Sequence, residues 1–188
     1  MNEFFSYVGG LIAFFNLMWF AYGIWNRKIP ASTPASFLMW TVLDVLILAS
    51  TLSAHKPCWL ALGYTVGALA VTVACYVRGK WLWSYKETIC AVGGIITAYI
   101  WMTWNAESAI LAGVCAMTIT GIPISVDLWQ NPIRETWKVW TITIIACVFT
   151  LLGSDWSLSG TILAWAGIAY NGTMAFFYHI FVVLEIYP

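Results

Sequence analysis

Apolar residues occur along this chain in seven long runs, separated by short polar segments. The runs span residues 4–25, 35–54, 57–77, 84–104, 107–129, 134–153 and 158–185. Each is close to the length of about 20 apolar residues that a helix needs to cross a membrane. Helix-start signals stand at Thr33-Pro34, at Asn131-Pro132 and in the capping-box spacing Ser84-x-x-Glu87. The pattern predicts an all-α integral membrane protein with seven transmembrane helices.

Composition indicates the same class. Of the 188 residues, 62% are hydrophobic and 9% are charged, and the formal net charge is zero. No basic run indicates nucleic-acid binding, and no Cys or His spacing is typical of a metal site. The five cysteines stand singly in apolar runs, which favours packing residues over disulfides. We expect neither a metal nor another cofactor.

Basic residues predict the orientation of the bundle, because Lys and Arg in short loops mark the cytoplasmic side. Lys56 alone lies in a connection on the opposite side. The others flank the first, third and fifth connections: Arg27, Lys28, Arg78, Lys80, Lys86, Arg134 and Lys138. We therefore expect the N-terminus outside and the C-terminus in the cytoplasm, in a bacterial inner membrane or a plasma membrane.

A repeat relates the second run to the sixth. Trp40-Thr41 stands near the start of one and Trp140-Thr141 near the start of the other. The simplest arrangement is a first triple-helix bundle at 1–80, a linker helix at 81–105 and a second triple-helix bundle at 106–188. Four runs precede the second bundle, so the two bundles are parallel. Transporters with parallel repeats bind their solutes between the repeats, near the membrane midplane.

Pro123 interrupts the fifth run and predicts a kink, because proline lacks a backbone donor and crowds the carbonyl four residues earlier. Together with the 3+1+3 layout and the Trp-Gln-Asn-Pro at 129–132, this segment resembles the SWEET/PQ-loop transporter superfamily. The chain resembles Pnu-type vitamin transporters more remotely. The superfamily has a Pro-Gln pair in the first helix of each bundle, whereas this chain has Ile124 after its proline and no proline in the first run. The resemblance implies alternating access with Pro123 as a hinge.

Polar residues far from the ends of the runs are the candidates for the site. Asp44 stands about nine residues into the second run, roughly 13 Å deep at about 1.5 Å per residue. An acid at that depth faces the bundle or a wet cavity, or it bridges two helices as a protonated group. We predict that Asp44 binds substrate and couples protons. His179 is a second proton-coupling candidate, with a packing role as its alternative.

Asn16, Trp40, Trp140 and Asn171 complete the predicted substrate-binding set. An amide offers two donors and an acceptor to a neutral solute, although it also serves for hydrogen bonds between membrane helices. Asn171 resembles the pocket asparagine that SWEET-type proteins carry on their last helix. The paired tryptophans offer apolar faces to a ring-shaped ligand, or they fill space between the bundles. Close helix contacts are predicted at seven glycines, namely Gly63, Gly67, Gly93, Gly94, Gly160, Gly167 and Gly172.

These patterns predict a uniporter or proton-coupled carrier for a small polar solute such as a sugar. The alternative is a non-transporting seven-helix receptor or membrane scaffold. A retinal photoreceptor is disfavoured because no lysine stands well inside a run. We expect no enzyme, because neither a Ser-His-Asp set nor HExxH occurs. The expected partners are the solute and the lipid bilayer, and a 3+1+3 chain is also compatible with a homo-oligomer.

Overall fold

The computed structural model describes residues 3–31, 33–130 and 137–183, without the side chains of residues 86, 122–130 and 178–183. The described residues form seven α-helices and no strands. The helices are α1 (Glu3–Trp25), α2 (Pro34–Ser53), α3 (Trp59–Arg78), α4 (Tyr85–Thr103), α5 (Ala106–Gln130), α6 (Trp137–Leu152) and α7 (Leu158–Val183). Each helix coincides with one apolar run to within a few residues, which confirms the predicted helices.

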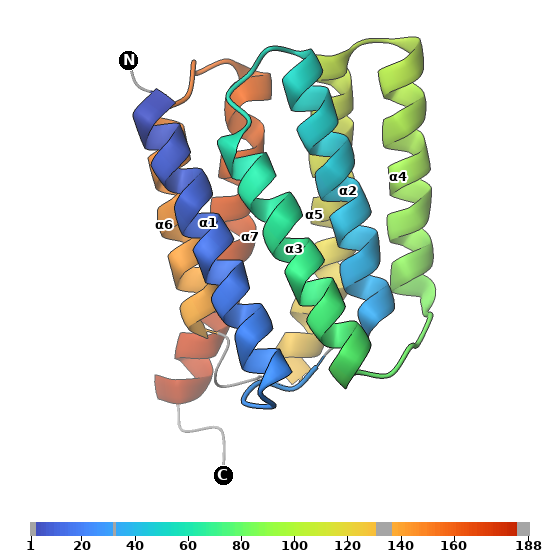
Figure 1. Cartoon of the computed structure of the whole chain (residues 1–188), viewed down its shortest axis with the longest axis vertical. Helices are drawn as coiled ribbons and strands as arrows, with labels where there is room; N and C mark the ends of the chain where they lie inside the picture. The colour runs from blue at the N-terminus through green and yellow to red at the C-terminus, as the bar shows by residue number, and fades with distance from the viewer. Residues whose placement is uncertain (1–2, 32, 131–136, 184–188) are drawn as a thin grey trace.

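Six of the helices form a closed ring in the order α1, α3, α2, α5, α7, α6 (Figure 1). The fourth helix packs outside this ring, against α2 and α5. Successive helices alternate in direction, so α1 begins at one end of the bundle and α7 runs toward the other (Figure 1). We call the end at which α1 begins the upper end and the end at which it finishes the lower end.

The helices α1, α2 and α3 are each long and apolar enough to cross a membrane. The described apolar stretches of α4, α5 and α6 are shorter. Large apolar side chains cover the outer faces of the bundle, among them Phe15, Leu69, Ile95, Ile119 and Phe176. A soluble monomer rarely exposes contiguous apolar surface of this kind. The exterior is therefore compatible with insertion into a membrane.

Small residues bring α1 and α3 close together. A Cβ added at Gly63 would lie 2.3 Å from the Gly10 carbonyl oxygen, and one added at Gly67 would lie 2.5 Å from Leu17 Cβ. The predicted close contacts at Gly63 and Gly67 are thus confirmed. The same prediction is wrong for Gly172, which has nothing within 4 Å of an added Cβ.

Two of the helix-start signals can be compared with the structure. The Ser84 backbone N–H donates to Glu87 Oε2 at 2.6 Å, as in a capping box, and the Ser36 hydroxyl of α2 also donates to Glu87. Pro34 begins α2 as predicted, but the Thr33 hydroxyl makes no cap hydrogen bond. It donates instead to the Leu82 carbonyl at 2.8 Å, so it joins the start of α2 to the connection before α4. Asn131 and Pro132 lie outside the described residues.

Candidate functional site

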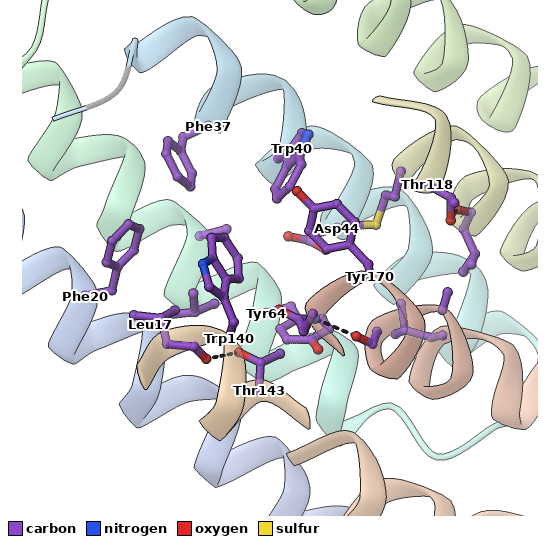
Figure 2. Close-up of a pocket in the computed structure, with 18 residues that line it drawn as sticks. Leu17, Phe20, Phe37, Trp40, Asp44, Tyr64, Thr118, Trp140, Thr143 and Tyr170 are labelled. Carbon is purple, nitrogen blue, oxygen red and sulfur yellow. Dashed lines mark hydrogen bonds between the residues drawn. The ribbon is translucent and has the colours of Figure 1, made fainter. Parts of the chain in front are cut away.

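A cavity of about 120 Å³ lies inside the ring (Figure 2). Residues of α1, α2, α3, α5, α6 and α7 line it, and none of the α4 residues whose side chains are described does. The volume has room for several waters, at about 30 Å³ each in the liquid. It is smaller than the about 300–1,000 Å³ of pockets that enclose drug-sized ligands. The cavity therefore suits a small ligand.

Four of the five predicted substrate-binding residues line this cavity, namely Trp40, Asp44, Trp140 and Asn171. They come from α2, α6 and α7, so the fold brings together residues that are far apart in the sequence. Asn16 does not line the cavity. Pro123 and His179 stand within α5 and α7, but their side chains lie outside the described part of the chain.

Asp44 supplies the only carboxyl group on the described cavity wall. It is 4% exposed, and it makes no hydrogen bond to the side chain of another described residue. Trp40 stands one helical turn before it on the same face of α2 (Figure 2). The described lining residues include no Lys, Arg or His. A negative charge on Asp44 would thus have no basic side chain beside it in the cavity.

Aromatic side chains from five helices, α1, α2, α3, α6 and α7, line this cavity. Tyr170 of α7 lies between the paired tryptophans, with ring centroids 5.9 Å from Trp40 and 6.2 Å from Trp140. Phe37 extends the group from Trp40 toward Phe20 of α1. We did not predict Tyr170, although it directly precedes the predicted Asn171. Tyr170 contacts both α2 and α6 because of the direction in which the three helices face one another, and the sequence does not show that direction.

The cavity wall uses its polar donors largely on its own helices. Asn171 Nδ2 donates to the Gly167 carbonyl at 2.6 Å, and the Thr118 hydroxyl donates to the Val114 carbonyl at 2.9 Å. The Thr143 hydroxyl donates to the carbonyl four residues earlier. The side-chain oxygens of Asp44 and Asn171 accept no hydrogen bond from another described residue, so acceptors remain on the wall. The buried indole N–H of Trp140 also has no partner among the described residues.

Asn16 supports the cavity wall from behind. Its Nδ2 donates to the Val139 carbonyl at 2.8 Å and to Thr143 Oγ1 at 2.9 Å, and both of these residues line the cavity. Asn16 is buried between α1 and α6. The structure therefore places this residue at a helix contact next to the cavity, where it holds α6 against α1.

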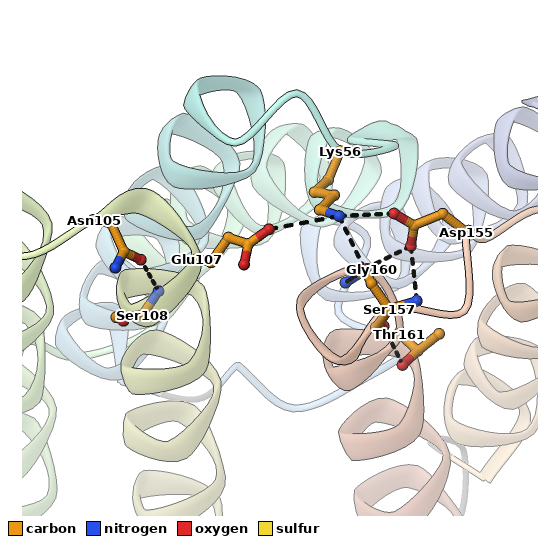
Figure 3. Close-up of polar contacts among 8 residues, drawn as sticks. All are labelled: Lys56, Asn105, Glu107, Ser108, Asp155, Ser157, Gly160 and Thr161. Carbon is orange, nitrogen blue, oxygen red and sulfur yellow. Dashed lines mark hydrogen bonds and ion pairs between the residues drawn. The ribbon is translucent and has the colours of Figure 1, made fainter.

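A group of charged residues joins separate connections at the upper end (Figure 3). Lys56, between α2 and α3, places its Nζ 2.8 Å from Asp155 Oδ2, between α6 and α7. The same Nζ lies 3.5 Å from Glu107 Oε1, in the first turn of α5. The hydrogen bond from Lys56 lowers the pKa of Asp155 to about 2, and this bond also raises the pKa of Lys56. We refer to Lys56, Glu107 and Asp155 as the upper ion-pair cluster.

Sequence reasoning missed this cluster. From the sequence, Lys56 was interpreted only as a charge that indicates orientation. Neither Asp155 nor Glu107 was predicted to make a contact. Two connections of equal length, 54–58 and 153–157, occur at matching places in the two halves. One connection contains a base and the other contains an acid. These complementary charges are the sequence signal that could have predicted their contact.

Comparison of the chain with models of protein families, with curated proteins and with solved structures found no match. Among the described residues, no group of three or more His, Cys, Asp and Glu could hold a metal ion. The site consists of a buried acid, an amide oxygen and a set of aromatic rings around a small cavity.

Proposed function

We propose that the chain is an integral membrane carrier, which moves a small polar solute by alternating access between two triple-helix bundles. The first bundle is residues 1–80, the second is residues 106–188, and α4 is the linker between them. One observation carries the proposal. The cavity is lined by all six helices of the two bundles and by no described residue of the linker. A solute bound there would contact both bundles, as alternating access requires.

The helix contacts support two equivalent bundles. In the first, α3 packs against both α1 and α2, and in the second, α7 packs against both α5 and α6. Between the bundles, α1 contacts α6 and α5 contacts α2. If α1 is equivalent to α5 and α2 is equivalent to α6, then the contact of α1 with α6 is equivalent to the contact of α5 with α2. Trp40 and Trp140 occupy matching positions on α2 and α6, and both line the cavity.

The upper ion-pair cluster supports closure of one end. Lys56 belongs to the first bundle, whereas Asp155 and Glu107 belong to the second, so their contacts tie the bundles together at the upper end. Breaking these contacts would let the bundles separate there. We propose that the cluster forms when the cavity is shut off from the upper side and dissolves when the cavity opens to that side.

Charge distribution supports an orientation with the upper end outside. Arg27 and Lys28 stand in the connection after α1, Arg78 ends α3, and Lys138 lies in the first turn of α6, all at the lower end. Lys56 is the only Lys or Arg of the upper connections at 54–58, 104–105 and 153–157. Because Lys and Arg in short loops mark the cytoplasmic side, we propose that the lower end faces the cytoplasm.

Reconstitution tests this proposal. The purified protein in liposomes is expected to accelerate entry of a labelled small solute from a panel of sugars, amino acids and organic amines. Combining Asp44→Asn with Asn171→Ala should abolish the accelerated entry, because both side chains line the cavity. Asn26→Ala, at an exposed residue after α1, is the control and should leave entry unchanged.

Entry that persists in the double variant would argue against a cavity pathway. A stable partner protein that copurifies with the chain, without flux of any solute in the panel, would instead favour the receptor or scaffold alternative.

A further inference from the structure

The chemistry of the cavity wall indicates which solutes it can hold. We infer that the cavity binds a small organic ammonium ion that carries no carboxylate, with Asp44 as its counter-ion and the rings of Trp40, Trp140 and Tyr170 as its walls. This inference rests on the proposed carrier function and specifies its substrate class.

Charge is the first argument. Asp44 is the only carboxyl group on the described wall, and the described wall has no Lys, Arg or His. Among the described residues, the other titratable groups near Asp44 are Tyr64, Tyr170 and Cys90. Phenols and thiols never carry positive charge. An ionised carboxylate taken out of water is costly unless a cation compensates it. No cation among the described residues does so, and an ammonium ion from outside could.

The aromatic rings are the second argument. An ammonium ion is attracted to the face of Trp or Tyr when it lies within about 6 Å of the ring centroid. The rings of Trp40 and Trp140 both make T-shaped contacts with Tyr170, and all three rings line the same cavity. Figure 2 shows Asp44 beside Trp40 and Tyr170. Aromatic rings around a cation are one means by which proteins recognise organic ammonium ions.

Hydrogen bonding is the third argument, and it favours an ammonium ion over a sugar. The hydroxyls of a sugar need donors as well as acceptors on the wall. Thr118 and Asn171 direct donors to carbonyls of their own helices, and the indole N–H of Trp140 is a wall donor without a hydrogen-bond partner among the described residues. Oxygens of Asp44 and Asn171 remain as acceptors, and an ammonium group needs acceptors alone. A solute with its own carboxylate is disfavoured, because no described basic residue on the wall would meet that group.

Proton exchange follows from the same balance of charge. With the cavity empty, the neutral form of Asp44 avoids the cost of an isolated buried charge. When an ammonium ion binds, the proton leaves Asp44 and the ion takes its place as the positive partner. The net charge of the cavity is unchanged by this exchange, so one proton should be released for each ion bound.

Propylammonium is the probe that tests this inference. We expect the purified protein in dodecyl maltoside to bind propylammonium in calorimetry and to release a proton, detected by a pH-sensitive dye in weak buffer. The neutral analogue 1-propanol and the zwitterion β-alanine should compete poorly. Asp44→Asn should weaken binding by about 30-fold or more and abolish proton release. Trp40→Leu should weaken binding by about 2- to 30-fold. Glu3→Gln, at an exposed acid on α1, should change neither the binding of propylammonium nor the release of the proton.

Three results would overturn the inference: no binding of propylammonium by the wild-type protein, unchanged binding by Asp44→Asn, or equally tight binding of 1-propanol. Liposomes of phosphatidylethanolamine and phosphatidylglycerol separate this inference from the carrier proposal. Binding of propylammonium through Asp44 without flux would refute transport and leave the cation site in place. Flux of glucose without ammonium binding would refute the cation site and leave the carrier in place.

Discussion

Lys56 Nζ lies 2.8 Å from Asp155 Oδ2, and this contact joins the connection after α2 to the connection after α6. Each connection contains a non-glycine residue in the left-handed region, His55 with a φ of 54° and Trp156 with a φ of 57°. Such residues are uncommon outside turns. Each stands next to a charged residue of the contact, so tight turns hold both partners at the upper end.

Breaking this contact should favour opening of the upper end. Lys56→Met removes the cation that meets Asp155 and Glu107. The open fraction should rise only a few-fold, because exposed ion pairs are weak. The measurement uses Thr118→Cys, at a position in the cavity, in a variant that lacks the native cysteines. An impermeant maleimide is added on the upper side, and the rate at which it labels this cysteine is followed. Lys28→Met, at the opposite end of the bundle, is the control. Equal labelling rates with and without Lys56 would show that this contact does not hold the end closed.

The same contact should depend on pH only at the extremes. The pKa of Asp155 is lowered to about 2 by the hydrogen bond from Lys56, so its stabilising contribution is complete above the ordinary Asp value of about 3.9. That contribution is lost as the pH falls through about 2. The pKa of Lys56 is raised, so its contribution is complete below the ordinary Lys value of about 10.4 and is lost as the pH rises through the raised value.

Thermal unfolding in detergent checks this pH dependence. The difference in melting temperature between the wild-type protein and Asp155→Asn should stay constant from about pH 5 to 8 and shrink below about pH 4. A difference that changes between about pH 5 and 8 would mean that another group controls the contact.

Asn16 should act on stability more than on solute binding. Asn16→Ala removes the hydrogen bonds to Val139 and Thr143, which join α1 to α6. Hydrogen bonds between membrane helices contribute about 0.6 kcal/mol on average and up to about 1.7 kcal/mol. The free energy of unfolding should fall by an amount in this range. Asn26→Ala is the control, since its exposed bond to the Tyr22 carbonyl lies within one turn. A loss of solute binding at unchanged stability would show that Asn16 contacts the solute, as the sequence predicted.

Depth along each helix could be predicted from the sequence, because residue counts from the run ends determine it. Asp44, Trp40, Trp140 and Asn171 were selected in this way, and all four line the cavity. Two other tryptophans that stand away from the run ends, Trp19 and Trp165, are 43% and 51% exposed on the outer surface.

The direction that a side chain faces could not be predicted from the pattern. Lipid is as apolar as the interior of the bundle, so a membrane helix shows no polar face to indicate which side packs inward. For this reason Tyr170 was missed, and Asn16 was placed in the cavity although it lies one layer behind the wall. The repeat of Trp40 and Trp140 is an exception, since matching positions in two halves favour matching environments.

Gly63 and Gly172 should respond oppositely to the same substitution. An added Cβ at Gly63 would lie 2.3 Å from the Gly10 carbonyl oxygen and 3.3 Å from the Phe14 nitrogen, both backbone atoms that cannot turn away. Gly63→Ala must therefore push α1 from α3, which should destabilise the fold by about 1–3 kcal/mol. An added Cβ at Gly172 meets nothing within 4 Å, so Gly172→Ala should stabilise α7 by up to about 1 kcal/mol, because alanine loses less backbone entropy than glycine in a helix. Reversible unfolding in mixed micelles, followed by tryptophan fluorescence, measures both changes. An equal effect of the two substitutions would contradict the close approach of α1 and α3, because helix propensity alone would then account for both.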